Sequence, residues 1–186
     1  MVASGSAGTG KTFLATSVAC EMFLRGKVSK IVITRPAVPA GGESYGYLPG
    51  SLNQKLAPWV LPVMEIIEEC LGKQQTIDYI KTGVIEIAPF GFMRGRTFRD
   101  AFVIVDEAQN TTIDQMKLLL TRMGDGSRLV ISGDITQSDI GKVSGLTETI
   151  RLIKKHRLPV PVVDFKPSDC VRSDMCKLWL EAFERG

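Results

Sequence analysis

The chain has 186 residues, of which 44% are hydrophobic, and its formal net charge is +3. This length and apolar content fit one folded domain, residues 1–186, and argue against intrinsic disorder. The weak positive charge does not by itself indicate a nucleic-acid-binding protein. The sequence shows no apolar run of the roughly 18 residues needed to cross a bilayer and no signal peptide, so we expect a cytoplasmic protein without membrane contact.

The chain opens on a phosphate-loop motif. Its sequence GSAGTGKT matches G-x-x-x-x-G-K-[ST], in which backbone amides wrap phosphate groups. We expect Lys11 to reach the β- and γ-phosphate oxygens and Thr12 to coordinate Mg²⁺. Apolar residues at helical spacing then predict a helix over residues 11–25, whose positive N-terminus lies under the phosphates. The predicted nucleotide-binding residues are Gly5, Ser6, Ala7, Gly8, Thr9, Gly10, Lys11 and Thr12.

Strands and helices alternate along the rest of the chain, which predicts an α/β protein with a mostly parallel sheet covered on both faces. Strands are predicted at residues 2–4, 30–36, 84–89, 101–107, 128–134 and 160–165. Further helices are predicted at about 52–71, and at 75–82, 112–123, 146–156 and 168–184. Pro58 and Pro62 predict that the helix over 52–71 starts late or bends. Residues 37–51 form a long loop that is either functional or a flexible surface insertion.

The strand at 101–107 ends in two carboxylates, Asp106 and Glu107. Opposite a phosphate loop, we expect Asp106 to hold Mg²⁺ through water and Glu107 to polarise the attacking water. A second carboxylate that activates water favours an ATPase over a switch protein or a small-molecule kinase. The alternative is a pair of solvated acids at a strand end.

Polar residues also follow the strand at 128–134. Asp134 ends this strand and Gln137 lies in the segment after it, where the carboxyl ends of parallel strands form a ligand crevice. We expect Asp134 and Gln137 to sense the γ-phosphate or the attacking water and to convert this into a conformational change. The alternative is an ordinary Gly-Asp turn.

Arginines outside the phosphate loop are candidates for nucleic-acid contact or for an arginine finger: Arg35, Arg94, Arg96 and Arg99. Three of them alternate with phenylalanines after the strand at 84–89, which suits a phosphate backbone with stacked bases, although plain solvated arginines fit too. Arg172, near the start of the last helix, is a candidate for contact with the γ-phosphate of its own subunit.

The cysteines and the single histidine give no support to a metal or disulfide site. Cys20, Cys70, Cys170 and Cys176 form no C-x-x-C pair, so we expect reduced thiols. His156 lies in a basic string and is expected at the surface.

One known family shares these strings in this order. The chain resembles the PhoH phosphate-starvation-inducible ATPases, relatives of superfamily 1 helicase cores, in GSAGTGKTFLA, ITRPAV, YLPGSLNQKLAPWVLPVMEII, IEIAPFGFMRGRTFRDAFVIVDEAQNTT and ISGDITQSD. The resemblance implies a three-layer RecA-like P-loop domain, ATP and Mg²⁺ as ligands, assembly as a homo-oligomeric ring such as a hexamer, and RNA as the substrate. It implies the same roles as the motifs above: nucleotide binding for the phosphate loop, metal and catalytic roles for Asp106 and Glu107, and sensor roles for Asp134 and Gln137. The family has His-Pro after the arginine that matches Arg172, whereas this chain has Ser-Asp.

Two functions fit the sequence. The first is Mg²⁺-dependent ATP hydrolysis coupled to single-stranded nucleic acid, with RNA favoured. The second is an ATP-controlled binding or assembly module that hydrolyses slowly and has no motor activity. Because almost no residues precede Gly5, we expect adenine recognition to be loose, borrowed from a neighbouring subunit or lost with a missing segment.

Overall fold

The structure, a computed structural model, describes residues 1–36, 52–141, 143–175, 178, 179 and 182, with the backbone alone for 52–59. The predicted loop at 37–51 lies outside these residues. The strands are β1 (Val2–Gly5), β2 (Lys30–Thr34), β3 (Ile85–Ile87), β4 (Ala101–Val105), β5 (Arg128–Gly133) and β6 (Val162–Phe165). The α-helices are α1 (Lys11–Leu24), α2 (Leu52–Leu71), α3 (Lys73–Lys81), α4 (Ile113–Leu120) and α5 (Gly145–His156). In the part of the chain that the structure describes, no helix is long and apolar enough to span a bilayer.

The strands form one sheet in the order β3-β2-β4-β5-β1-β6, and every pair of neighbours is parallel. The first strand lies inside the sheet, with Val2 aligned to Ile131 of β5 on one side and to Val162 of β6 on the other. All carboxyl ends therefore meet at one edge of the sheet, where the loop after β1 begins. This arrangement confirms the predicted α/β fold of the RecA-like P-loop type.

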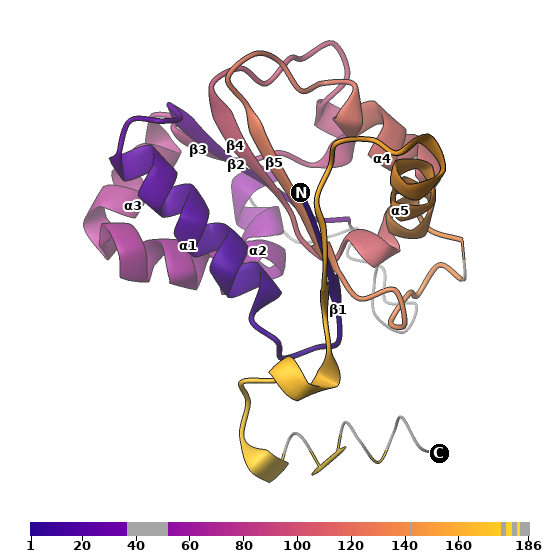
Figure 1. Cartoon of the computed structure of the whole chain (residues 1–186). Helices are drawn as coiled ribbons and strands as arrows, with labels where there is room; N and C mark the ends of the chain where they lie inside the picture. Colours follow the sequence, from indigo (N-terminus) through magenta and orange to yellow (C-terminus); the bar gives the residue numbers. More distant parts are fainter. Residues whose placement is uncertain (37–51, 142, 176–177, 180–181, 183–186) are drawn as a thin grey trace.

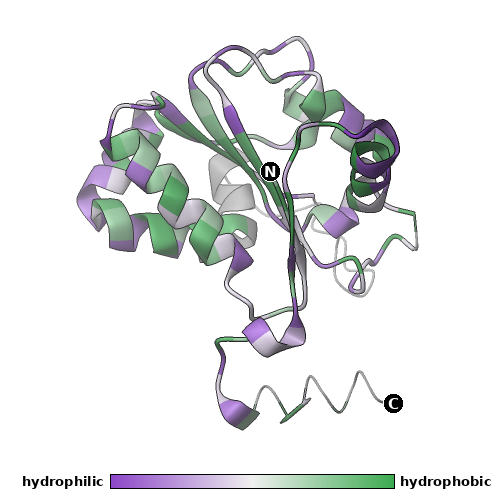
Figure 2. Ribbon diagram, in the orientation of Figure 1, coloured by the Kyte–Doolittle hydropathy of each residue, from purple (hydrophilic) through white to green (hydrophobic). Residues whose placement is uncertain are grey.

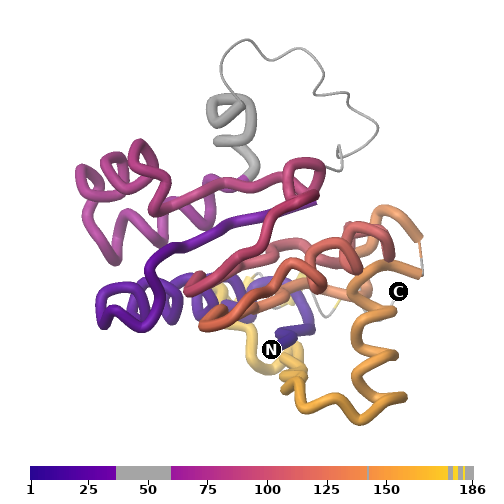
Figure 3. Tube along the Cα trace, turned by 90° about the horizontal axis from the view of Figure 1, so that it is seen from above, coloured from indigo at the N-terminus to yellow at the C-terminus, as the bar shows by residue number. Residues whose placement is uncertain are grey.

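Helices cover both faces of the sheet and give three layers (Figure 1; Figure 3). Alternate residues of each strand face opposite layers, because side chains in a strand point alternately up and down. Ile31 and Ile33 pack in a buried cluster with residues of α1 and α2, whereas Val32 packs in a second cluster with residues of α4 and α5. Figure 2 shows that the central strands are almost wholly hydrophobic, as expected of a parallel sheet buried on both faces.

Two helix predictions are corrected by the structure. The helix α2 begins at Leu52 and contains both Pro58 and Pro62, so the prediction of a late start is wrong. Proline removes a backbone donor, but the buried residues Val63 and Ile67 pack this helix onto the core, and packing of this kind supplies most helical stability. The predicted helix at 168–184 does not start at Ser168, because Pro167–Asp169 form a 3₁₀ turn and helical backbone begins only at Asp174.

Other boundaries differ by a few residues. The helix α4 ends at Leu120, short of the predicted end at 123. Its start follows the prediction, because the Thr112 side chain accepts a hydrogen bond from the backbone amide of Gln115 in a capping box. The strand β6 starts at Val162, two residues later than expected.

The cysteines in the described part of the chain are free thiols. Cys20 and Cys170 are buried and Cys70 is exposed, while Cys176 lies outside the described residues. Burial, with the neighbouring Cys70 as a second cause, raises the pKa of Cys20 to about 12. Its thiol therefore stays protonated at neutral pH and is a poor nucleophile.

An ion-pair cluster on β3 holds one of the predicted arginines. Glu86 accepts hydrogen bonds from Arg96 (Nη2 to Oε2, 2.9 Å) and from Lys30 (Nζ to Oε2, 2.8 Å). The guanidinium of Arg96 also lies 5.1 Å from the centre of the Phe98 ring. Hydrogen bonding from Arg96 holds the pKa of Glu86 below its ordinary value of 4.5. These contacts indicate that Arg96 joins the segment after β3 to the sheet.

Replacing Glu86 by Gln should lower the free energy of unfolding by about 1–2 kcal/mol at neutral pH, because Arg96 and Lys30 lose their carboxylate. Since the pKa of Glu86 is lowered in the folded state, this stabilisation is complete above about pH 5 and is lost as the pH falls through the lowered pKa. Urea unfolding of both proteins at several pH values should show the difference shrinking in acid. A difference that is independent of pH would contradict this. Glu21→Gln is the control, because the Glu21–Arg25 pair is exposed.

Candidate nucleotide site

The phosphate loop connects the end of β1 to the start of α1. Gly8 has φ +76°, and a Cβ atom at this position would lie 2.9 Å from Cδ of Arg172. Glycine is required here both by the left-handed backbone and by the close approach of that side chain. The amide of Val171 donates to the carbonyl of Gly8 (3.0 Å), so the segment after β6 lies directly against the loop.

Lys11 folds back over its own loop. Its ammonium group donates to the carbonyls of Gly5 (2.7 Å) and Ser6 (2.6 Å). Burial lowers the pKa of Lys11, while the nearby carboxylates of Asp134 and Glu107 act in the opposite direction. The ammonium group is thus surrounded by oxygen atoms at the mouth of the loop, which is where the motif needs a cation for phosphate oxygens.

Thr12 and Asp106 bring the two halves of the predicted metal site together. The Thr12 hydroxyl donates to Oδ1 of Asp106 (2.7 Å), and the hydroxyl of Ser132 donates to the same oxygen (3.1 Å). Asp106 is 4% exposed. A hydroxyl and a carboxylate that touch at the edge of a phosphate loop form a set of hard oxygen donors, the ligands that Mg²⁺ prefers. These residues therefore fit the metal that the sequence predicts.

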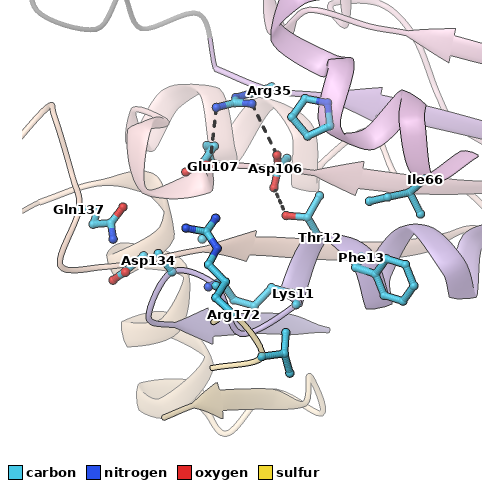
Figure 4. A pocket seen from close by; sticks show the side chains of 16 residues that line it. Lys11, Thr12, Phe13, Arg35, Ile66, Asp106, Glu107, Asp134, Gln137 and Arg172 are labelled. Carbon is cyan, nitrogen blue, oxygen red and sulfur yellow. Dashed lines mark hydrogen bonds and ion pairs between the residues drawn. The ribbon is translucent and has the colours of Figure 1, made fainter. Parts of the chain in front are cut away.

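Glu107 follows β4 in a left-handed backbone conformation, with φ +52°. A non-glycine residue in this region is strained by about 1 kcal/mol or more and is often found at functional sites. The Arg35 guanidinium lies 3.6 Å from Oε1 of Glu107 and 3.8 Å from Oδ2 of Asp106. Arg35, predicted only as a nucleic-acid or finger candidate, thus lies beside both carboxylates (Figure 4).

Gln109 connects the two strand ends, and sequence reasoning gave it no role. Its Nε2 donates to Oε2 of Glu107 (2.6 Å), and its Oε1 accepts from the amide of Asp134 (3.1 Å). The side chain is 2% exposed. A Cβ atom on Gly133 would lie 2.6 Å from Oε1 of Gln109, so glycine leaves room for this bridge. The signal in the sequence was the DEAQ string itself, in which the glutamine follows the glutamate closely.

Asp134 and Gln137 lie at the same edge of the sheet. The Asp134 carboxylate accepts hydrogen bonds from the backbone amide and the hydroxyl of Thr136 (2.9 and 2.6 Å). The backbone amide of Gln137 donates to the backbone carbonyl of Asp134 (3.1 Å). The segment therefore forms a hydrogen-bonded turn, which was the alternative interpretation. Both side chains nevertheless line the cavity of the phosphate loop.

One open cavity of about 420 Å³ collects most of the predicted residues. Lys11, Thr12, Asp106, Glu107 and Asp134 line it together with Gln137, Arg35 and Arg172 (Figure 4). Arg172 reaches it even though its neighbours depart from the family pattern.

The other arginine candidates, Arg94, Arg96 and Arg99, do not line this cavity. Arg96 is bound to Glu86. Arg94 is exposed and lines a separate hollow with Asp114 and Lys117. Arg99 is exposed near Gly124, ahead of β4. The assignment of Arg94, Arg96 and Arg99 to nucleic-acid contact or to an arginine finger stays a prediction.

A phosphate loop between the first strand and its helix, joined by Thr12 to the acid that follows β4, defines the class of P-loop NTPase folds. The family model described as PhoH-like protein matches residues 1–184. The chain belongs to this family, as the resemblance predicted.

Relatives support the same family. The chain is 42% identical over 185 residues to Protein PhoH of Escherichia coli (strain K12), and this aligned region covers 97% of this chain and 52% of that protein. It is 43% identical over 183 residues to the PhoH-like protein of Bacillus subtilis (strain 168), 97% of this chain and 57% of that one. For the PhoH-like protein of Synechocystis sp. (strain ATCC 27184 / PCC 6803 / Kazusa) the identity is 44% over 184 residues, 98% of this chain and 56% of the relative. The chain spans about half the length of these relatives.

Proposed function

We propose that the chain binds ATP with Mg²⁺ and hydrolyses it, and that hydrolysis is coupled to single-stranded RNA. One observation supports hydrolysis above all: the hydroxyl of Thr12 in the phosphate loop donates a hydrogen bond to Asp106, and the next residue, Glu107, lines the same cavity. A loop that only binds phosphate does not require a second carboxylate, Glu107, held in place by a hydrogen bond from Gln109.

Each residue has a chemical task in this proposal. The loop amides and Lys11 bind the phosphate oxygens. Thr12 and Asp106 would hold Mg²⁺, which when bound neutralises charge on the β- and γ-phosphates. Glu107 accepts the proton of the attacking water as a general base, and Gln109 fixes its orientation.

Besides Lys11, the cationic side chains of Arg35 and Arg172 would stabilise charge that develops on the γ-phosphate. Both line the cavity, and Arg35 lies on the side of the two carboxylates. Gln137 lies nearby and is suited to sense the loss of the γ-phosphate. The proposal extends to assembly of this chain as a homo-oligomeric ring, which the family resemblance supports.

The RNA part of the proposal is supported by an exposed surface outside the nucleotide cavity. Phe92 is 60% exposed and Arg94 is exposed two residues later, next to a hollow lined also by Lys117. Arg94 and Lys117 would attract phosphate groups although Asp114 lines the same hollow, and the exposed Phe92, two residues from Arg94 in sequence, offers a ring on which a base can stack.

ATP hydrolysis by the purified chain, with and without single-stranded RNA, tests the proposal. The variant Lys11→Ala should lose hydrolysis with and without RNA, whereas Lys27→Ala, at an exposed lysine beyond α1, should keep it. Phe92→Ala combined with Arg94→Ala should lose stimulation by RNA and keep the basal rate. Absence of RNA stimulation in the wild-type chain would contradict the coupling, and the ATP-controlled assembly module would then be favoured.

A further inference from the structure

The nucleotide cavity has two chemically different ends. Figure 4 shows Glu107, Asp134 and Gln137 toward one side of it, and Phe13 and Ile66 on the other. The first end carries carboxylates, an amide and the guanidinium of Arg35 beside Glu107, and the second carries an aromatic ring and an aliphatic side chain. A ligand that fills this cavity must therefore be charged at one end and apolar at the other.

A nucleoside triphosphate has this polarity, and the phosphate loop fixes its direction. Lys11 and Thr12 lie between the two ends, where they meet the phosphates, and the catalytic carboxylate Glu107 marks the place of the γ-phosphate. The base must then lie on the opposite side. We propose that the side chain of Phe13 is the base-binding residue, and that the base is held by stacking rather than by hydrogen bonds to its edge. This inference rests on the proposed function.

Phe13 has the exposure expected of such a residue. It follows Thr12 directly in the first turn of α1, and it is 51% exposed although it is a large aromatic side chain. A phenylalanine ring left half in water gains free energy when a flat apolar group covers it. On α2, Ile66 lies at the same end of the cavity as Phe13 (Figure 4). Pro62 also lines the cavity, and a spacing of four residues places it on the same face of that helix as Ile66. They provide a second apolar wall.

The chemistry of this end predicts weak discrimination between bases. Phe13, Pro62 and Ile66 have no side-chain donor or acceptor, and among the described lining residues the polar groups lie toward the phosphates. A site with buried hydrogen-bond partners rejects a wrong ligand strongly, whereas an apolar surface does not. Every base has a π-face, so stacking tolerates different bases. We expect ATP and GTP to bind with dissociation constants within about threefold of each other.

Equilibrium titration with ATP, GTP and inorganic tripolyphosphate tests this inference without relying on turnover. Tripolyphosphate carries the phosphates and no base. Phe13→Ala should weaken ATP and GTP binding about tenfold or more, the usual worth of a base–aromatic stack, and leave tripolyphosphate binding unchanged. Phe13→Trp should restore the affinity for ATP. Leu14→Ala is the matched control, because Leu14 is the next residue of α1, is 49% exposed and does not line the cavity.

The outcomes separate this inference from the function on which it rests. A wild-type chain that binds neither ATP nor tripolyphosphate would overturn both. A wild-type chain that binds ATP with Phe13→Ala equal to Leu14→Ala would overturn the inference alone, and so would rejection of GTP by about 100-fold. Loss of tripolyphosphate binding in Phe13→Ala would also overturn it, because the variant would then have damaged the phosphate loop rather than a base site.

Discussion

The variant Glu107→Gln should lose ATP hydrolysis by about 100-fold to 10,000-fold, the usual contribution of a positioned general base. Glutamine keeps the size of the side chain and can still accept a hydrogen bond from Gln109, so the site should stay folded. It cannot take a proton from water. Binding of ATP should therefore change by only a few-fold, which equilibrium titration beside single-turnover hydrolysis would measure.

This variant also separates the two candidate functions. If hydrolysis drives the activity, Glu107→Gln should abolish RNA-dependent turnover while it retains ATP. If the chain works as an ATP-controlled assembly module, the same variant should assemble with ATP as the wild-type chain does. A variant with a wild-type hydrolysis rate would remove Glu107 from the mechanism.

The second large effect is expected from Gln109→Leu. Leucine has a similar volume but leaves Oε2 of Glu107 and the amide of Asp134 without their partner. We expect kcat to fall by about 10-fold to 100-fold, because a misoriented base loses much of its contribution. The KM for ATP should change little, since Gln109 does not line the nucleotide cavity. The free energy of unfolding should fall by about 1–3 kcal/mol.

The neighbouring Asn110 gives a matched control. Its amide group donates to Oδ2 of Asp139 (2.8 Å) and its carbonyl oxygen accepts from the Asp139 amide (2.9 Å), so it joins the same two segments on their outer side. Asn110→Ala should cost stability without lowering kcat to the same extent. Equal losses of kcat in both variants would show that Gln109 acts only by holding the two segments together.

Most of the phosphate site could be predicted from the sequence because its parts are local. The loop from Gly5 to Thr12 is one continuous string, and its chemistry follows from the residue order. Asp106 and Glu107 could be placed as well, because a buried strand ending in acids has few other roles beside such a loop. The parallel sheet brought them together as expected, with Thr12 and Asp106 in direct contact.

Contacts between distant or differently oriented side chains could not be read from the sequence. Arg96 looked like part of a basic cluster, but its partner Glu86 lies in the preceding strand and its orientation is set by that pair. The DEAQ string places Gln109 close to Glu107 in sequence, but it does not show that the turn after β4 directs the Gln109 side chain between the two strand ends. The position of Arg172 could not be read from the sequence for a similar reason, since a backbone hydrogen bond from Val171 to Gly8 holds its segment against the phosphate loop.

The position of β1 in the sheet has a consequence for the order of folding. This strand precedes its sheet neighbours β5 and β6, which come from the distant residues 128–133 and 162–165. Contacts so distant in sequence form late, since the chain must close long loops before they can stabilise it. During synthesis β1 therefore pairs with both of its neighbours only after residue 165 has emerged, so the phosphate loop that follows β1 is completed later than the rest of the sheet.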